Sequence, residues 1–349
     1  MKRTTFELSQ NSQIGKSPAM RGVNLNDMIE EREGKYLFQF GLSFLYPSDT
    51  RFKPSDLFGD RAYISPNLEN DTYTGRLLKG ERVVACVDFN HVNDALVSIH
   101  YGTWGGIYFD GRPSLTLLKK WFAWIEQRAR IFGVQVIKMK LPPTAFDDFR
   151  VSRNLSVFDG IGGYSEVRDY SFISAPCSRE EFISSVDASN RNKINKCMNA
   201  GAAIKFASEL SFLKRCHRTI EVNRASKDIP ISLSWKRFAS IVERHPSKWF
   251  GGIVELDDVD IAAGLFLKTN PAAVYVSMWG ELPAYKSLSP VASIALALND
   301  HCLREKVAVI DAGTATEDGV VNKGLWDFKA NLGFQETLKL TLEKKLLEN

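Results

Sequence analysis

The chain has 349 residues, of which 44% are apolar and 25% are charged, and its net charge is +4 at neutral pH. This composition is ordinary for a globular protein, the length predicts about two domains, and so small a net charge gives no case for nucleic-acid binding. No run of about eighteen apolar residues occurs, and residues 1–34 lack the apolar segment of a signal peptide, so we expect a cytoplasmic protein without a membrane span.

The five cysteines lie far apart in the sequence, at positions 86, 177, 197, 216 and 302. No Cys-x-x-Cys pair is present, which favours a reducing compartment. We therefore expect no zinc site and no other metal site.

The first half begins with an N-terminal arm, residues 1–35, followed by a domain over residues 36–175. Short strand patterns cover residues 74–79, 81–90 and 95–102, and turn residues separate them. Ser114 then begins an amphipathic helix that ends at Gly133, and the next strand covers residues 134–141.

The second half repeats this order of elements, so we predict a second domain over residues 176–349. Four turn or cap residues of the first half have counterparts in the second, at offsets of 177, 177, 175 and 173 residues. The pairs are Gly80 with Asp257, Asn93 with Asn270, Ser114 with Ser289, and Val134 with Val307. Offsets this constant predict two copies of one hairpin–strand–helix–strand unit.

Extra helices precede the sheet of the second copy, and they are basic. Between residues 191 and 248 the chain has thirteen Lys or Arg and four Asp or Glu, a net charge of +9. Within this segment the Asn- and Lys-rich stretch 191–201 predicts a helix with Arg191, Lys193 and Lys196 away from the core, while Ile194, Cys197 and Met198 face it. Such a row can bind phosphate or carboxylate oxygens, although a plain solvated helix face explains it equally well.

The last part of the chain, residues 272–334, holds the residues with the clearest chemical potential. An alternating strand over 272–279 is followed by a loop and by a helix that begins at Ser289-Pro290. An unbroken apolar strand, 307–310, ends at Asp311, and a short amphipathic helix carries Phe328 and Lys329. A carboxylate at the end of a buried strand and a lysine between aromatic side chains can belong to one pocket.

Four stretches in this order resemble the Fem-type branch of the GNAT superfamily. They are Arg191-x-x-Ile-x-Lys-x-x-x-x-Gly201, Tyr285-Lys-Ser-Leu-Ser-Pro290, the strand that ends in Asp311, and Phe328-Lys329-x-x-x-Gly-Phe334. The resemblance covers residues 70–342. It implies an α+β fold of two tandem GNAT-like domains, each a mixed, mostly antiparallel sheet flanked by helices.

The resemblance also implies site residues. Lys329 matches the lysine at the reaction centre of the family and Phe328 its neighbour, and Trp104-Gly105-Gly106 resembles the glycine pair of the acceptor pocket. Asp311 can orient the attacking amine or act as a base, or simply cap the next segment. Three aromatic residues can line the acyl pocket, namely Tyr275, Trp279 and Tyr285, although core packing explains the first two as well. For Lys329 the alternative is a surface lysine lying over Trp326, and for the glycine pair it is a bulge or turn.

The implied function is N-acyl transfer: an aminoacyl or acyl group passes to an amine of a cell-envelope precursor or an amino sugar. The donor is then aminoacyl-tRNA or an acyl-CoA. The segment 279–290 lacks the glycine spacing of a coenzyme A pyrophosphate site and carries Glu281, which favours aminoacyl-tRNA. The alternatives are acyl-CoA-dependent N-acetylation of a small amine and a non-catalytic GNAT-like binding module. The acyl group, the acceptor and the oligomeric state do not follow from the sequence.

Overall fold

The computed structural model describes residues 29–42, 54, 56, 58, 72–98 and 103–346. The first 28 residues of the predicted N-terminal arm and positions 99–102 of a predicted strand lie outside this part. Within it, no helix is long and apolar enough to cross a bilayer.

The first half contains seven strands and two helices in its described residues. They are β1 (Ile29–Glu33), β2 (Tyr36–Leu42), β3 (Thr72–Lys79), β4 (Arg82–Val92), β5 (Ala95–Ser98), β6 (Tyr108–Phe109), α2 (Leu115–Ile131), β7 (Val136–Pro143) and α3 (Asp148–Ile161). Residues 29–33, assigned above to the arm, form an edge strand because they pair with β2 over their whole length.

The second half follows β8 (Ser165–Ser174) and precedes β16 (Gln335–Lys345). Its helices are α4 (Arg179–Ser185), α5 (Ala188–Asn199), α6 (Leu210–Ala225), α7 (Trp235–Arg244), η5 (Pro246–Lys248), η6 (Pro283–Leu288), α8 (Pro290–Arg304) and α9 (Lys323–Ala330). Its strands are β9 (Ala203–Ala207), β10 (Trp249–Leu256), β11 (Val259–Asn270), β12 (Ala273–Glu281), β13 (Val309–Thr314), β14 (Thr316–Glu317) and β15 (Val320–Val321).

The predicted tandem repeat is confirmed. In both halves a hairpin leads to a third strand, a helix crosses over, and the next strand pairs parallel to the third. Gly80 and Asp257 both have positive φ in the first hairpin turn, and Asn93 has positive φ in the second turn, where the matched Asn270 bonds to the backbone of Ala272. The matched landmarks therefore occupy matched places in two mixed, mostly antiparallel sheets.

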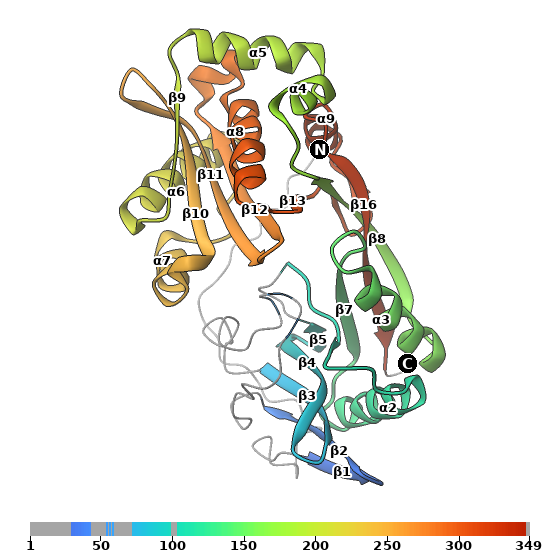
Figure 1. Ribbon diagram of the computed structural model, residues 1–349. Coiled ribbons are helices and arrows are strands. Elements are labelled where there is room, and N and C mark those ends of the chain that lie inside the picture. Colours follow the sequence, from blue (N-terminus) through green and yellow to red (C-terminus); the bar gives the residue numbers. More distant parts are fainter. Residues whose placement is uncertain are drawn as a thin grey trace, which may run out of the picture.

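The two sheets are continuous. Along the main path the strand order is β1-β2-β3-β4-β5-β7-β16-β8-β13-β12-β11-β10-β9. The pair β8 and β16 runs between the halves (Figure 1). The end of β8 pairs with β13 and the end of β16 pairs with β7, so Leu340 and Leu342 pack in the core of the first half although the predicted second domain includes them. The boundary at 175/176 stays a prediction.

Helices cover both faces of the second sheet. The apolar side chains of α4, α5 and α8 pack on one face, and those of α6 and α7 pack on the other. In the first half, α2 and α3 pack on a single face. The sheet of the second half is thus buried on both sides, which explains the unbroken apolar character of its strands.

Side-chain caps fix most α-helix starts, and three details of the second half differ from what the sequence predicts. Ser178 and Glu181 form a capping box, and Ser114 accepts a hydrogen bond from the Leu117 amide. Ser289 precedes α8 but makes no side-chain cap; the Glu281 carboxylate accepts from the Val291 amide instead, at 3.4 Å. Met198, predicted to face the core, is 37% exposed because Ile194 and Cys197 already fill the buried stripe of α5. Asp311 does not end its strand, since β13 continues to Thr314 by pairing with β8.

Candidate functional site

The parallel strands β12 and β13 separate in the middle of the sheet. Their register joins Ala273 to Val309, Val274 to Ile310 and Tyr275 to Asp311, and it stops there, although β12 continues to Glu281 and β13 to Thr314. In β12 a register shift against β11 leaves Ser277 without a matched residue, which marks a β-bulge. Backbone groups of β12 beyond Tyr275 therefore have no strand partner on the β13 side among the described residues.

Asp311 lies where the two strands separate and is fully buried. Its Oδ1 accepts hydrogen bonds from the Ser171 hydroxyl and the Gly313 amide, each at 2.7 Å. Its Oδ2 has no partner within the part of the chain that the structure describes. Burial raises the pKa of the Asp311 carboxyl, and these two hydrogen bonds oppose the rise. A buried acceptor with free lone pairs is the most chemically distinctive atom in this region.

Lys329 reaches the same place from α9. The side chain is 3% exposed, and Nζ donates to the carbonyl oxygens of Gly313 and Thr314 at 2.8 and 2.7 Å. An ammonium has three protons, so two are used and one is left. Burial lowers the pKa of Lys329 to about 8, and Asp311 opposes the decrease. The interpretation of Lys329 as a surface lysine is wrong.

Lys339 and Tyr275 complete the group, which we call the Asp311 cluster (Asp311, Tyr275, Lys329 and Lys339). Lys339, on β16, donates from Nζ to the Thr103 carbonyl at 2.7 Å, and burial lowers its pKa to about 8. Burial raises the pKa of Tyr275 to about 12, and the Asp311 charge adds to this effect. The cluster combines the buried Asp311 carboxyl with one buried and one half-buried amine, both of which hold their protons less tightly than usual.

The lowered lysine pKa values predict an unusual pH dependence of stability. Between pH 8 and 9.5 the unfolded chain binds more protons at these two lysines than the folded chain, so their contribution to the free energy of unfolding rises with pH. We expect the Lys339→Met variant to gain less stability over this interval than the wild type. Urea unfolding of both proteins at each pH measures the difference, in which the shared cysteine and tyrosine titrations cancel. Parallel curves would contradict the lowered Lys339 pKa.

In the first half, residues 103–106 lie against the Asp311 cluster. The Trp104 indole is buried and lies edge-on to Tyr275, with ring centroids 6.1 Å apart. Gly105 donates its amide to the Lys140 carbonyl at 2.7 Å. Gly106 has φ +91°, and a Cβ there would lie 3.0 Å from Leu141 and 3.2 Å from Asn154, so the turn geometry accounts for this glycine.

No protein-family model and no curated protein matches the sequence. Solved structures do match. FemX has a TM-score of 0.61 at 10% identity, over 84% of this chain and 92% of that chain. The C-terminal domain of a putative lysylphosphatidylglycerol synthetase from Agrobacterium fabrum has a TM-score of 0.51 at 10% identity, and the match covers 75% of this chain and 81% of that chain. L-PGS from Bacillus licheniformis has a TM-score of 0.51 at 10% identity, and the match covers 76% of this chain and 82% of that chain. The chain therefore has a FemX-like fold, with the two tandem α+β units that the resemblance implies.

Within this fold most of the predicted site residues fall into three groups. Tyr275, Asp311, Lys329 and Trp104 come together at the separating strands. Trp279 and Phe328 pack against the apolar core beneath α4, α5 and α8, where their rings meet edge-on with centroids 5.7 Å apart.

Four predicted residues lie on η6 and on the neighbouring helix α5. Tyr285 is half-buried on η6, which packs against α5. Arg191 donates to the Val186 carbonyl, so the end of α4 uses part of its guanidinium. Lys196 is exposed, and the Lys193 charge acts on Glu281. These residues border the start of α8 and not the Asp311 cluster.

Sequence reasoning missed Lys339 and Ser171. Lys339 alternates with Leu338 and Leu340 in a strand whose polar face predicts solvent exposure. Only the insertion of β16 between β7 and β8 brings that face against Thr103. Ser171 lies in β8, where the sequence shows only the alternation of a strand and nothing that marks a site residue.

Proposed function

We propose that this protein is an N-acyltransferase in which the Asp311 cluster is the reaction centre and the amine attacks the acyl carbon directly. The observation that carries the proposal is the buried, unpartnered Oδ2 of Asp311 beside Lys329, at the point where β12 and β13 separate. The similarity to FemX and to lysylphosphatidylglycerol synthetase domains supports the reaction class.

The roles follow from what each group can donate or accept. The amine nitrogen forms a bond to the acyl carbon, and the bond from that carbon to the donor oxygen, or sulfur in a thioester, breaks. Asp311 Oδ2 accepts a proton from the attacking amine, and the leaving group takes up one proton. The third proton of Lys329 and the free amides of β12 near Trp279 stabilise the oxyanion. No covalent enzyme intermediate is needed, because orientation and charge stabilisation supply the rate.

For the donor we propose aminoacyl-tRNA, and for the acceptor an amine of a cell-envelope precursor. The start of α8 supports this choice. Glu281 Oε2 accepts from the Val291 amide there, so a carboxylate already occupies one of the amides that a coenzyme A phosphate would use. Lys193, Lys227 and Lys286 lie close enough to act on the Glu281 charge. The basic helices between 191 and 248 supply positive charge suited to a polyanionic donor.

The test of the function is transfer of label. Purified protein is incubated with aminoacyl-tRNA carrying labelled amino acids and with a peptidoglycan precursor that has a free amine; a parallel reaction contains labelled acetyl-CoA and an amino sugar. We expect label to move from aminoacyl-tRNA to the precursor. Transfer from acetyl-CoA alone would replace our donor, and absence of transfer in every reaction would favour a non-catalytic binding module.

Coenzyme A binding gives a separate prediction. Isothermal titration of the wild type with acetyl-CoA should give no micromolar binding, because Glu281 competes with phosphate at the start of α8. The Glu281→Gln variant removes the charge and keeps the shape, so any residual affinity should rise in it. The Glu305→Gln variant, at the other end of α8, is the matched control. Micromolar binding to the wild type would overturn the donor assignment.

A further inference from the structure

The segment Thr103-Trp104 of the first half contacts both Tyr275 and Lys339. The Thr103 carbonyl accepts from Lys339 Nζ at 2.7 Å, and the Thr103 side chain lies close enough to the Tyr275 hydroxyl to oppose the rise of the Tyr275 pKa. Trp104 packs edge-on against the Tyr275 ring. Whatever holds residues 103 and 104 in place therefore also sets two members of the Asp311 cluster.

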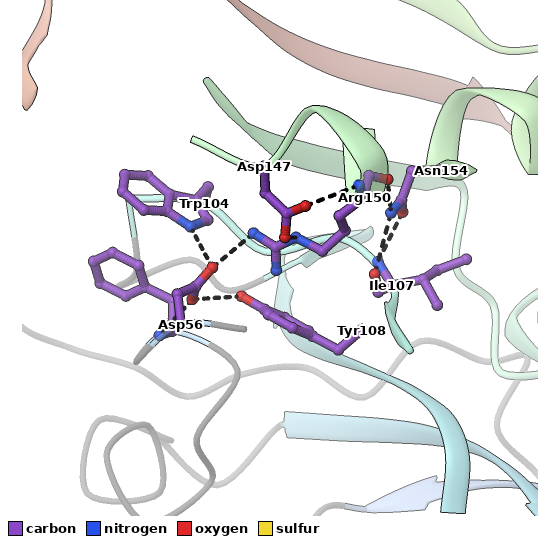
Figure 2. Close-up of polar contacts among 8 residues, drawn as sticks. Asp56, Trp104, Ile107, Tyr108, Asp147, Arg150 and Asn154 are labelled. Atoms are coloured by element: carbon purple, nitrogen blue, oxygen red, sulfur yellow. Dashed lines mark hydrogen bonds and ion pairs between the residues drawn. The ribbon is translucent and has the colours of Figure 1, made fainter. Parts of the chain in front are cut away.

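One carboxylate holds this segment from the opposite side. Asp56 Oδ2 accepts from the Trp104 indole at 3.0 Å and from Arg150 Nη2 at 2.7 Å, and Oδ1 accepts from the Tyr108 hydroxyl at 3.0 Å. Figure 2 shows these three donors converging on Asp56 from three elements of the first half. Asp56 is 7% exposed, so the bonds form away from solvent.

Arg150 is fixed in turn, so the network is rigid. Its guanidinium lies over the Tyr108 ring, 4.2 Å from the centroid, and Nε pairs with Asp147 at 3.4 Å. One helical turn further along α3, Asn154 bonds to both the amide and the carbonyl of Ile107, which fixes the far end of the 103–107 segment (Figure 2). Buried charges bonded in this way cost much to rearrange.

We infer that Asp56 is a positioning residue, which acts through Trp104 and Thr103 to set Lys339 and Tyr275 at the Asp311 cluster. The inference rests on the proposed function only in taking that cluster as the reaction centre. Asp56 lies in the first half and the cluster lies at the junction with the second, so the first half would have a direct part in arranging the site.

The chemistry of Asp56 makes the inference specific. A carboxylate only accepts hydrogen bonds, and three side-chain donors point at it. An asparagine would direct its amide protons at some of these donors and leave Arg150 with less compensating charge. Trp104→Phe removes the indole N–H with part of the ring, introduces no new polar group and keeps an aromatic ring beside Tyr275, so it tests the same link without changing a buried charge.

The experiment measures the exposure of each lysine in the intact protein. Amines are labelled with trace acetic anhydride over a range of pH, and mass spectrometry gives the extent of labelling at Lys339 and Lys329. In Trp104→Phe and Asp56→Asn we expect the labelling rate of the neutral Lys339 amine, taken from the high-pH plateau of each profile, to increase about fivefold, the factor that corresponds to one lost hydrogen bond. The pH midpoint of Lys339 labelling should rise from about 8 toward the ordinary lysine value. Lys329 should change little, because its partners lie on β13.

Two matched controls separate positioning from general damage. Trp124→Phe removes a buried indole N–H that has no partner among the described residues, and Asp148→Asn removes an exposed charge from the first turn of α3 that bonds only weakly to Ser152, at 3.4 Å. Both should leave Lys339 labelling unchanged. Circular dichroism and the urea midpoint report whether each variant is folded.

Unchanged Lys339 labelling in folded Trp104→Phe protein would overturn the inference, as would an equal increase at Lys329 and Lys339. The labelling does not depend on turnover. The positioning role can therefore fail while acyl transfer is observed, and it can hold if acyl transfer is not.

Discussion

Replacing Lys329 with methionine should reduce turnover about 10²- to 10³-fold, the usual effect of removing one oxyanion donor. Methionine keeps an unbranched apolar stem beside Phe172 and removes the ammonium that donates to Gly313 and Thr314. The reacting oxygen would lose its cationic donor, while α9 keeps its contacts through Phe328 and Trp326. Initial rates under saturating donor and acceptor measure the effect.

Lys323→Met is the matched control on the same helix. Lys323 is exposed and pairs only weakly with Asp327, at 3.5 Å, so its loss should leave turnover and stability within error. Wild-type turnover in folded Lys329→Met protein would remove Lys329 from the reaction. A large loss of stability in that variant would instead assign the lysine to holding the end of β13.

The repeat was predictable because it depends on local chemistry. Hairpin turns need residues that tolerate positive φ, and helices need caps, so Gly80, Asn93 and Ser114 were visible as single positions with matched partners. The capping box at Ser178 was predictable for the same reason. These signals lie within a few residues of the structure they specify.

The pairing of β8 with β16 was not predictable in this way. It joins residues 165–173 to 335–343, and strand alternation does not say which strand lies beside which. The error at Asp311 has the same origin, since β13 extends to Thr314 only because Ser171 lies opposite it. Asp56 lies in a proline-containing stretch of sequence that has no periodic signal, so its contact with Trp104 could not be predicted from the sequence.

Replacing Asp311 with asparagine should reduce turnover about 10²- to 10⁴-fold, the usual contribution of a general base. The side chain keeps its shape, and its orientation is dictated by Ser171 and the Gly313 amide, which both require an acceptor at Oδ1. The amide nitrogen must then take the place of Oδ2, the atom without a partner. The substitution therefore removes the free lone pairs and little else. Ser171→Ala, which removes one bond to Oδ1 and spares Oδ2, should have a smaller effect.

Stability should move in the opposite direction from turnover. The pKa of Asp311 is raised in the folded protein, so between the ordinary carboxyl value and the raised value the folded chain binds more protons than the unfolded chain. The contribution of Asp311 to the free energy of unfolding consequently falls as pH rises through that window and stays low above it. Asparagine carries no charge to bury, so Asp311→Asn should be as stable as the wild type at pH 7, or more stable, and its stability should depend less on pH above 4. Urea unfolding at pH 4, 5.5 and 7 measures this. If Asp311→Asn is slower and clearly less stable than the wild type at pH 7, Asp311 serves the fold. If it is slower and more stable, the carboxylate is retained for proton transfer at a cost in stability.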